Sequence, residues 1–349
     1  MTDPTPAPFV LRNTSRYALL SAPFVIIAGL WATPGLVVYD AVKFVPPEPV
    51  AAAPSDGHRL FVKHCASCHG EQGDGNGTAN LNPRARHFGF EPFKFATTVK
   101  RQELGYAFAC PTDENLLALL KRGIPGSSMP AFQEPPTGTA PATQVQADLT
   151  DDELKAIIGH VRTLTRKGVF AKVLATATVK QLKDITGESE DDKAIKAATP
   201  ADWTEARKEA DKPMQLAAAA DALTTVGTAL PFPATFPSAT PEALANGRQL
   251  FVKATCASCH GAGGQGDGEQ FKEPLPGQPD KRPKNADGSP AYPRDLTAGI
   301  YKGGGDAHSL YARIRLGIPG SPMPASEASS VSEKDVADLI HFVQSLKGQ

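Results

Sequence analysis

The chain has 349 residues, with 36 Lys and Arg against 37 Asp and Glu, and a formal net charge of −1. This length exceeds one ordinary domain and predicts two or three compact units. The balanced charge excludes the basic surface that a nucleic-acid-binding protein would need.

The N-terminal region contains a long apolar stretch. Residues 17–39 read YALLSAPFVIIAGLWATPGLVVY and carry no charge. The length of this stretch exceeds the roughly 20 residues that a helix needs to cross a bilayer. Arg12 and Arg16 precede this stretch, so residues 1–16 are expected on the cytoplasmic side. The alternative is a cleaved secretory signal, but its apolar core is shorter, about 7–15 residues.

We therefore expect a transmembrane anchor at 17–39 and an extended, proline-rich tether at 40–56. The rest of the chain would lie on the periplasmic side of the cell inner membrane.

The hexapeptide CASCHG occurs twice, at Cys65–Gly70 and at Cys256–Gly261. Its two cysteines stand at i and i+3 and its histidine at i+4, so the three side chains share one helix face. Two thiols can then bond one porphyrin while the imidazole reaches the iron, and C-x-x-C-H is the typical motif of covalent haem c attachment. The motifs predict two haems c, with thioether bonds from Cys65, Cys68, Cys256 and Cys259 and iron ligation by His69 and His260.

The alternative is that the paired cysteines bind zinc. The two pairs lie much further apart than in a zinc ribbon, and each is followed at once by a histidine that zinc does not require. The fifth cysteine, Cys110, stands alone in the sequence Ala109-Cys110-Pro111, and we interpret it as a small buried residue.

The repetition extends well beyond the hexapeptides. GHRLFVK precedes the first motif and GRQLFVK the second, while GIPGSSMP follows the first and GIPGSPMP the second. Each copy ends in an apolar-striped segment that opens with a helix-capping signal, at Thr150 and at Ser332. The sequence thus predicts two copies of one domain, at 57–168 and 241–349. Residues 169–240 are expected to form a helical arm and linker, and Phe271–Tyr292 an exposed inserted loop.

One methionine recurs in the same proline-flanked setting of each copy, as Met129 and Met323. A haem iron with histidine on one side transfers electrons when a second protein ligand closes the other side. We therefore predict Met129 and Met323 as the second axial ligands.

Together these motifs, in the order G-x-x-x-F, C-x-x-C-H-G, G-I-P-G-x-x-M-P and a final helix, resemble class I cytochrome c. The resemblance covers residues 57–166 and 242–349, and the whole chain resembles the membrane-anchored tandem dihaem cytochromes c of bacterial respiratory chains. It implies an all-α fold, here a transmembrane helix followed by two such domains. In this family a loop proline carbonyl usually accepts a hydrogen bond from the ligand histidine, which makes Pro83 and Pro293 the candidates. Arg84 and Arg294 are candidates for pairing with haem propionates.

The expected function is membrane-tethered electron transfer between redox protein partners, such as a quinol-oxidising bc-type complex or a terminal oxidase, by a carrier that is not itself an enzyme. The alternatives are a dihaem peroxidase and a haem-based gas-binding module. Both need an open iron position, whereas each copy here supplies a methionine.

Overall fold

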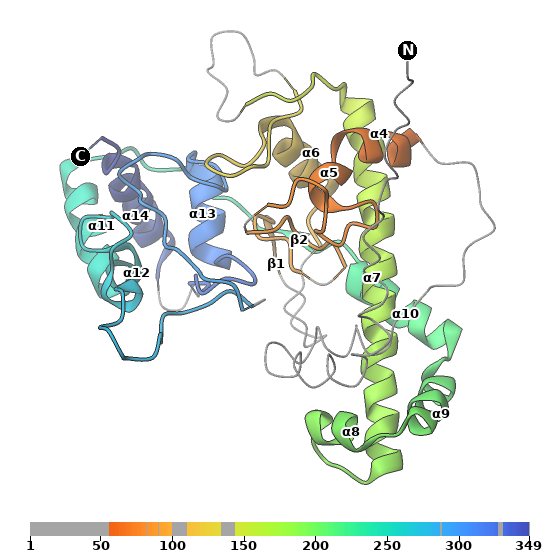
Figure 1. Ribbon diagram of the computed structural model, residues 1–349. Helices are drawn as coiled ribbons and strands as arrows, with labels where there is room; N and C mark the ends of the chain where they lie inside the picture. Colours follow the sequence, from red (N-terminus) through yellow and green to blue (C-terminus); the bar gives the residue numbers. More distant parts are fainter. Residues whose placement is uncertain are drawn as a thin grey trace, which may run out of the picture. The chain divides into compact units, whose positions relative to one another are not determined.

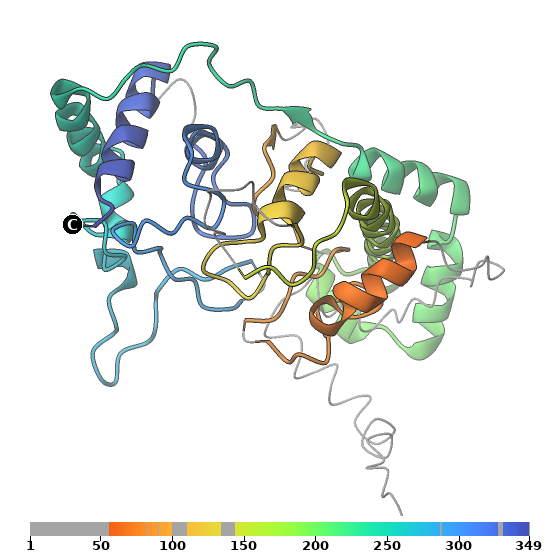
Figure 2. The same ribbon diagram turned by 90° about the horizontal axis from the view of Figure 1, so that it is seen from above.

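The computed structural model describes residues 56–348 apart from 82, 90, 100–109, 134–143, 287 and 327–330. These residues are mostly helical and divide into two compact units. The smaller unit comprises residues 175–211 of the described chain, and the larger unit holds both sequence repeats. Figures 1 and 2 show the elements from two directions.

The predicted transmembrane fold requires correction. No helix in the described part of the chain is both long enough and apolar enough to cross a membrane. The longest, α7 (Asp151–Thr186), has 36 residues, but charged side chains recur along its length. The predicted span at 17–39 lies outside the described residues, which form a mostly helical fold without a membrane-spanning helix.

The first repeat is built from α4 (Asp56–His64), α5 (Ala66–His69), α6 (Asp113–Arg122) and the N-terminal part of α7. Its core joins α4, α6 and α7 through side chains that are at most 8% exposed: Phe61, Leu116, Leu154, Ile157 and Leu164. The capping box predicted before α7 is confirmed, since the Thr150 N–H donates to Glu153 Oε2 (2.9 Å) and the Glu153 N–H donates to Thr150 Oγ1 (3.3 Å).

The second repeat contains α11 (Pro241–Lys253), α12 (Cys256–His260), a 3₁₀ turn η2 (Glu269–Phe271), α13 (Ala307–Leu316) and α14 (Glu333–Ser345). Helices α11 and α14 run side by side in both views (Figures 1 and 2). Ser332 caps α14 by accepting a hydrogen bond from the Asp335 N–H. The core between them is formed by Phe251, Leu339, Phe342 and Val343.

The first and last helices of each repeat approach very closely at a glycine of the first helix. A methyl group on Gly57 of α4 would lie 2.1 Å from the carbonyl oxygen of Ala156 in α7. The same group on Gly247 of α11 would lie 2.2 Å from the carbonyl oxygen of Asp338 in α14. Glycine is therefore a packing requirement at both positions.

The segment between the repeats is largely helical. α7 continues without a break to Thr186, and α8 (Asp191–Ala197), α9 (Pro200–Ala210) and α10 (Pro213–Thr224) follow. Trp203 of α9 packs against the buried side chains of Leu182, Ala194 and Ala206 in the smaller unit. After α10 a short strand β2 (Thr228–Ala229) pairs antiparallel with β1 (Thr98–Val99) of the first repeat.

The helix contact gives a first prediction. Gly57→Ala and Gly247→Ala should each lower the free energy of unfolding by about 1–3 kcal/mol, because the added methyl group overpacks a backbone contact. Guanidinium-induced unfolding of the loaded protein measures this. Gly159→Ala in α7 is the matched control, since a methyl group there meets nothing within 4 Å. It should be neutral or stabilise the helix, and equal effects at all three positions would contradict the packing argument.

Candidate haem sites

Each C-x-x-C-H motif forms a short helical turn that begins at or directly after its first cysteine. In the first copy the His69 N–H donates to the Cys65 carbonyl (2.9 Å). The thiol of Cys65 is buried and that of Cys68 half-buried, and all four motif cysteines are free thiols. Burial raises the pKa of Cys65 to about 12 and also raises that of Cys256. Two cysteine side chains and one imidazole therefore stand together in each repeat.

A glycine loop then folds back over the end of each motif helix. The N–H groups of Gly75 and Gly266 donate to the carbonyls of His69 and His260, both at 2.8 Å. These bonds satisfy carbonyls that a helix end otherwise leaves open. A methyl group on Gly77 would lie only 2.2 Å from the Ser67 carbonyl oxygen, so the loop can approach only because a side chain is missing.

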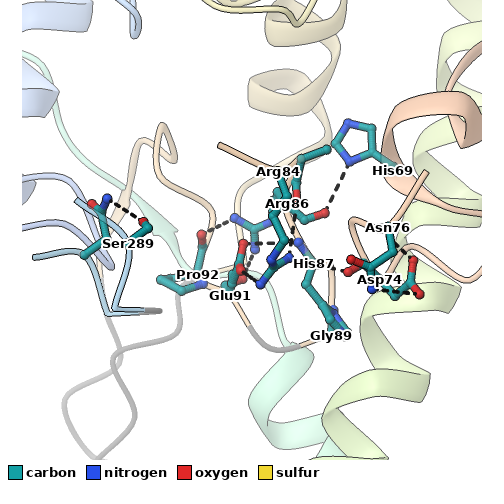
Figure 3. A network of polar contacts seen from close by, with 12 residues as sticks. His69, Asp74, Asn76, Arg84, Arg86, His87, Gly89, Glu91, Pro92 and Ser289 are labelled. Atoms are coloured by element: carbon teal, nitrogen blue, oxygen red, sulfur yellow. Dashed lines mark hydrogen bonds and ion pairs between the residues drawn. The ribbon is translucent and has the colours of Figure 1, made fainter. Parts of the chain in front are cut away.

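The loop fixes the orientation of each motif histidine. His69 Nδ1 lies 3.3 Å from the carbonyl oxygen of Arg86 (Figure 3), and His260 Nδ1 lies 3.0 Å from that of Arg294. Burial lowers the pKa of both imidazoles, partly offset by this hydrogen bond. Each ring is thus held neutral, and when Nδ1–H donates to the carbonyl, the Nε2 lone pair is available to a metal.

The predicted carbonyl acceptors, Pro83 and Pro293, are therefore wrong. The acceptor is the Arg86 carbonyl in the first repeat and the Arg294 carbonyl in the second. The reason is the register, which is how the acceptor loop aligns with the glycine loop. The Phe88 N–H donates to the Gly73 carbonyl (2.8 Å), and the Leu296 N–H donates to the Gly264 carbonyl (2.7 Å), so residues 86 and 294 take the same position.

This register makes Arg86, not Arg84, the counterpart of Arg294. The dipeptide Pro-Arg at 83–84 resembles Pro-Arg at 293–294, but the first lies two residues too early. Arg84 instead forms an ion pair with Glu91. Ala85 occupies the position of Pro293, so proline is not what sets the acceptor.

Arg86 is a half-buried charge of the first repeat. Its guanidinium donates to the carbonyls of Glu91 and Pro92 (Figure 3). It also lies 3.7 Å from the ring centroid of Phe93. Burial lowers its pKa to about 9, with Glu91 acting in the opposite direction.

One donor of Arg86 remains unsatisfied. The buried Nε of Arg86 has no hydrogen-bond partner within the described residues, and neither has the buried Nε of Arg294. An unmade hydrogen bond of a buried charged group is costly, and a carboxylate is its natural acceptor. These matched donors, beside matched thiols and imidazoles, fit a porphyrin that carries propionates.

The two methionine loops form the same backbone and serine hydrogen bonds. The Ile124 N–H donates to the Met129 carbonyl and the Ile318 N–H to the Met323 carbonyl, both at 3.1 Å. Ser127 Oγ accepts from the Met129 N–H (3.2 Å) and donates to the Ile124 carbonyl (2.8 Å). In the second copy Ser321 Oγ does the same, at 3.3 and 2.8 Å.

This serine clamp was missed in the sequence, although serine stands two residues before both methionines. It fixes the backbone of Met129 independently of the following proline. The Met129 side chain packs against the core cluster that contains Cys65.

The environments of the two histidines differ. Phe88 stacks on His69 with ring centroids 4.7 Å apart and an interplanar angle of 22°. Leu296 occupies the equivalent position in the second repeat. The sequence does not signal this role, since the two residues share only their apolar character.

The fifth cysteine, Cys110, belongs to neither C-x-x-C-H motif. Cys110 is 1% exposed, and burial raises its pKa to about 11, which keeps the thiol neutral. Within the described ranges no three or more His, Cys, Asp and Glu side chains gather closely enough to hold a bare metal ion.

Comparisons with known proteins agree with this geometry. The family described as cytochrome c matches residues 54–165 and 244–347. No curated protein matches the chain. A solved structure, the "Kuenenia stuttgartiensis reducing HAO-like protein complex Kustc0457/Kustc0458", contains a similar chain with 21% sequence identity and a TM-score of 0.56. The match covers 87% of this chain and 100% of that one, and it indicates a shared fold.

The two matched regions coincide with the two repeats and together cover more than half of the residues. Family membership implies covalently bound haem c and haem-based electron transfer. The chain belongs to the cytochrome c family and carries two of its domains in tandem.

Proposed function

We propose that this protein is a dihaem electron carrier, not an enzyme, that passes single electrons to and from a redox protein partner. Each domain would bond one haem c through its paired cysteines and close the iron with histidine and methionine. The proposed iron ligands are His69 with Met129 and His260 with Met323. The observation that carries the proposal is the repetition of the methionine loop with the same hydrogen bonds in both copies.

The residues of each site suit electron transfer because hydrogen bonds hold both the histidine ring and the methionine backbone in place. Bound haem c supplies a metal centre that gains and loses one electron. The carbonyl of Arg86 or Arg294 holds the imidazole in one orientation, and the serine clamp holds the methionine backbone. A ligand set fixed on both sides keeps its geometry in both oxidation states. It also excludes water and small molecules from the iron.

The partner is proposed to be a protein of a respiratory chain. The chain of similar fold belongs, by its title, to a protein complex, which supports a protein partner here. Covalent haem attachment takes place outside the cytoplasm, so we place the haem domains on the periplasmic side.

The test is the ligation state of the loaded protein. Met129→Ala and Met323→Ala should each convert one of two low-spin haems into a site that binds carbon monoxide, because each removes one axial ligand. Absorption spectra of the reduced protein with and without carbon monoxide measure this, and a pyridine assay counts the haems.

Met214→Ala is the matched control, since Met214 in α10 is 85% exposed. It should leave both haems closed. Carbon monoxide binding by the unaltered reduced protein would contradict the proposal and favour a peroxidase or a gas-binding module.

A further prediction separates the two candidate arginines of the first domain. Arg86→Gln should lower the reduction potential of the haem bound at His69, because a nearby buried cation disfavours the oxidised, more positive iron. Spectroelectrochemical titration should show a fall on the order of tens of millivolts, while Arg84→Gln should change it little because Arg84 is paired with Glu91. A larger effect from Arg84 would overturn the register given above.

A further inference from the structure

The two cytochrome domains meet within the larger unit through arginines that donate to backbone carbonyls. Arg122 of α6 donates to the Gly303 carbonyl (2.5 Å), and Arg313 of α13 donates to the carbonyls of Lys94 (2.6 Å) and Ala96. A third arginine, Arg294, donates from the second domain to the carbonyls of Gly126 (3.2 Å) and Pro125 (3.4 Å).

Arg294 differs from the other two because it also belongs to a haem site. Its own carbonyl orients His260, and its buried Nε has no partner within the described residues. Its terminal nitrogen, Nη2, reaches the loop that carries Met129. Arg86, its counterpart, donates instead to the carbonyls of Glu91 and Pro92 of its own domain.

The contact at the Met129 loop is close. A methyl group on Gly126 would lie 2.1 Å from Arg294 Nη2, and the residue has a left-handed φ of +67°. Gly126 lies next to Ser127, whose hydroxyl clamps the Met129 N–H. The guanidinium therefore holds the backbone immediately before that clamp.

The opposite contact is apolar. A methyl group on Gly320, the equivalent glycine of the Met323 loop, would lie 2.9 Å from Cγ of Pro92. A methionine loop thus lies against the other domain in both copies. Among the described residues, only Arg294 makes this contact with a charged hydrogen-bond donor.

We propose that Arg294 is a positioning residue shared by both haem sites: it orients His260 in its own domain and holds the Met129 loop of the other. This inference rests on the function proposed above. Its consequence is that the ligand bond in the first domain depends on a side chain of the second, so a change at one haem is transmitted to the other.

The test uses the loaded full-length protein with Arg294→Gln. Without the charged donor, Met129 should be displaced more easily, because a hydrogen bond from a charged group is worth enough to change an equilibrium tenfold or more. Titration of the oxidised protein with imidazole should show about tenfold tighter binding at the first haem. The bound methionine methyl signals in the NMR spectrum of the reduced protein, assigned with Met129→Ala and Met323→Ala, identify the site.

Arg122→Gln is the matched control, because it removes another interdomain arginine that donates to a carbonyl. It should leave the imidazole affinity near that of the unaltered protein. Arg294→Lys keeps the charge but loses the planar fork of donors. It should therefore retain the potential of the second haem while still loosening Met129.

A second variant reverses the direction. Gly126→Ala, in the first domain, should displace the Arg294 side chain and shift the potential of the haem bound at His260. The absorption spectrum of the Gly126→Ala variant checks that both domains still hold their haem, which this test requires.

Two haems with methionine ligation, but an Arg294→Gln effect confined to the second haem, would overturn the inference and leave the proposed function intact. An equal loosening of Met129 in Arg122→Gln would also overturn it. Failure of the unaltered protein to bind two closed haems would instead overturn the proposed function.

Discussion

The hydrogen bond between the motif histidine and a backbone carbonyl is the interaction on which both haem sites depend. It links the helical turn that carries the thiols to a loop that lies 17 residues further along in the first repeat and 34 in the second. The two spacings differ because the second domain carries an insertion, yet the geometry at the imidazole is the same. The insertion is accommodated entirely before the acceptor, so the loop register at Phe88 and Leu296 is preserved.

Much of the site could be predicted from the sequence because its chemistry is local. The cysteines and histidine of each motif stand within five residues, so helix geometry alone brings them to one face. The paired methionines were recognised because Gly-Ile-Pro-Gly and Pro surround both. Gly57 and Gly247 stand at the same place in the two copies, and both permit a close helix contact that a methyl group would prevent.

The errors have an equally physical origin. Pro83-Arg84 was matched to Pro293-Arg294 because the letters agree, but hydrogen bonds to the glycine loop decide the register, and these place Arg86 there. The first domain was predicted to end at Gly168, which lies inside α7. That glycine serves instead for a close approach to Gly89, where a methyl group would lie 2.2 Å from the Gly89 Cα, and the helix continues. Helix α7 ends at Thr186, directly before Gly187, which has a left-handed φ of +74°. Contacts between domains, such as that of Arg294, depend on tertiary packing and leave no mark in a single sequence.

The smaller unit carries its own optical label. The chain has two tryptophans, and Trp203 packs into the cluster of Leu182, Ala194 and Ala206, while Trp31 stands in the N-terminal sequence outside the described residues. Neither indole belongs to a cytochrome domain. Tryptophan emission therefore reports on parts of the chain outside the two cytochrome domains, whereas visible haem absorption reports on those domains. The two signals can follow different segments of one molecule as it unfolds.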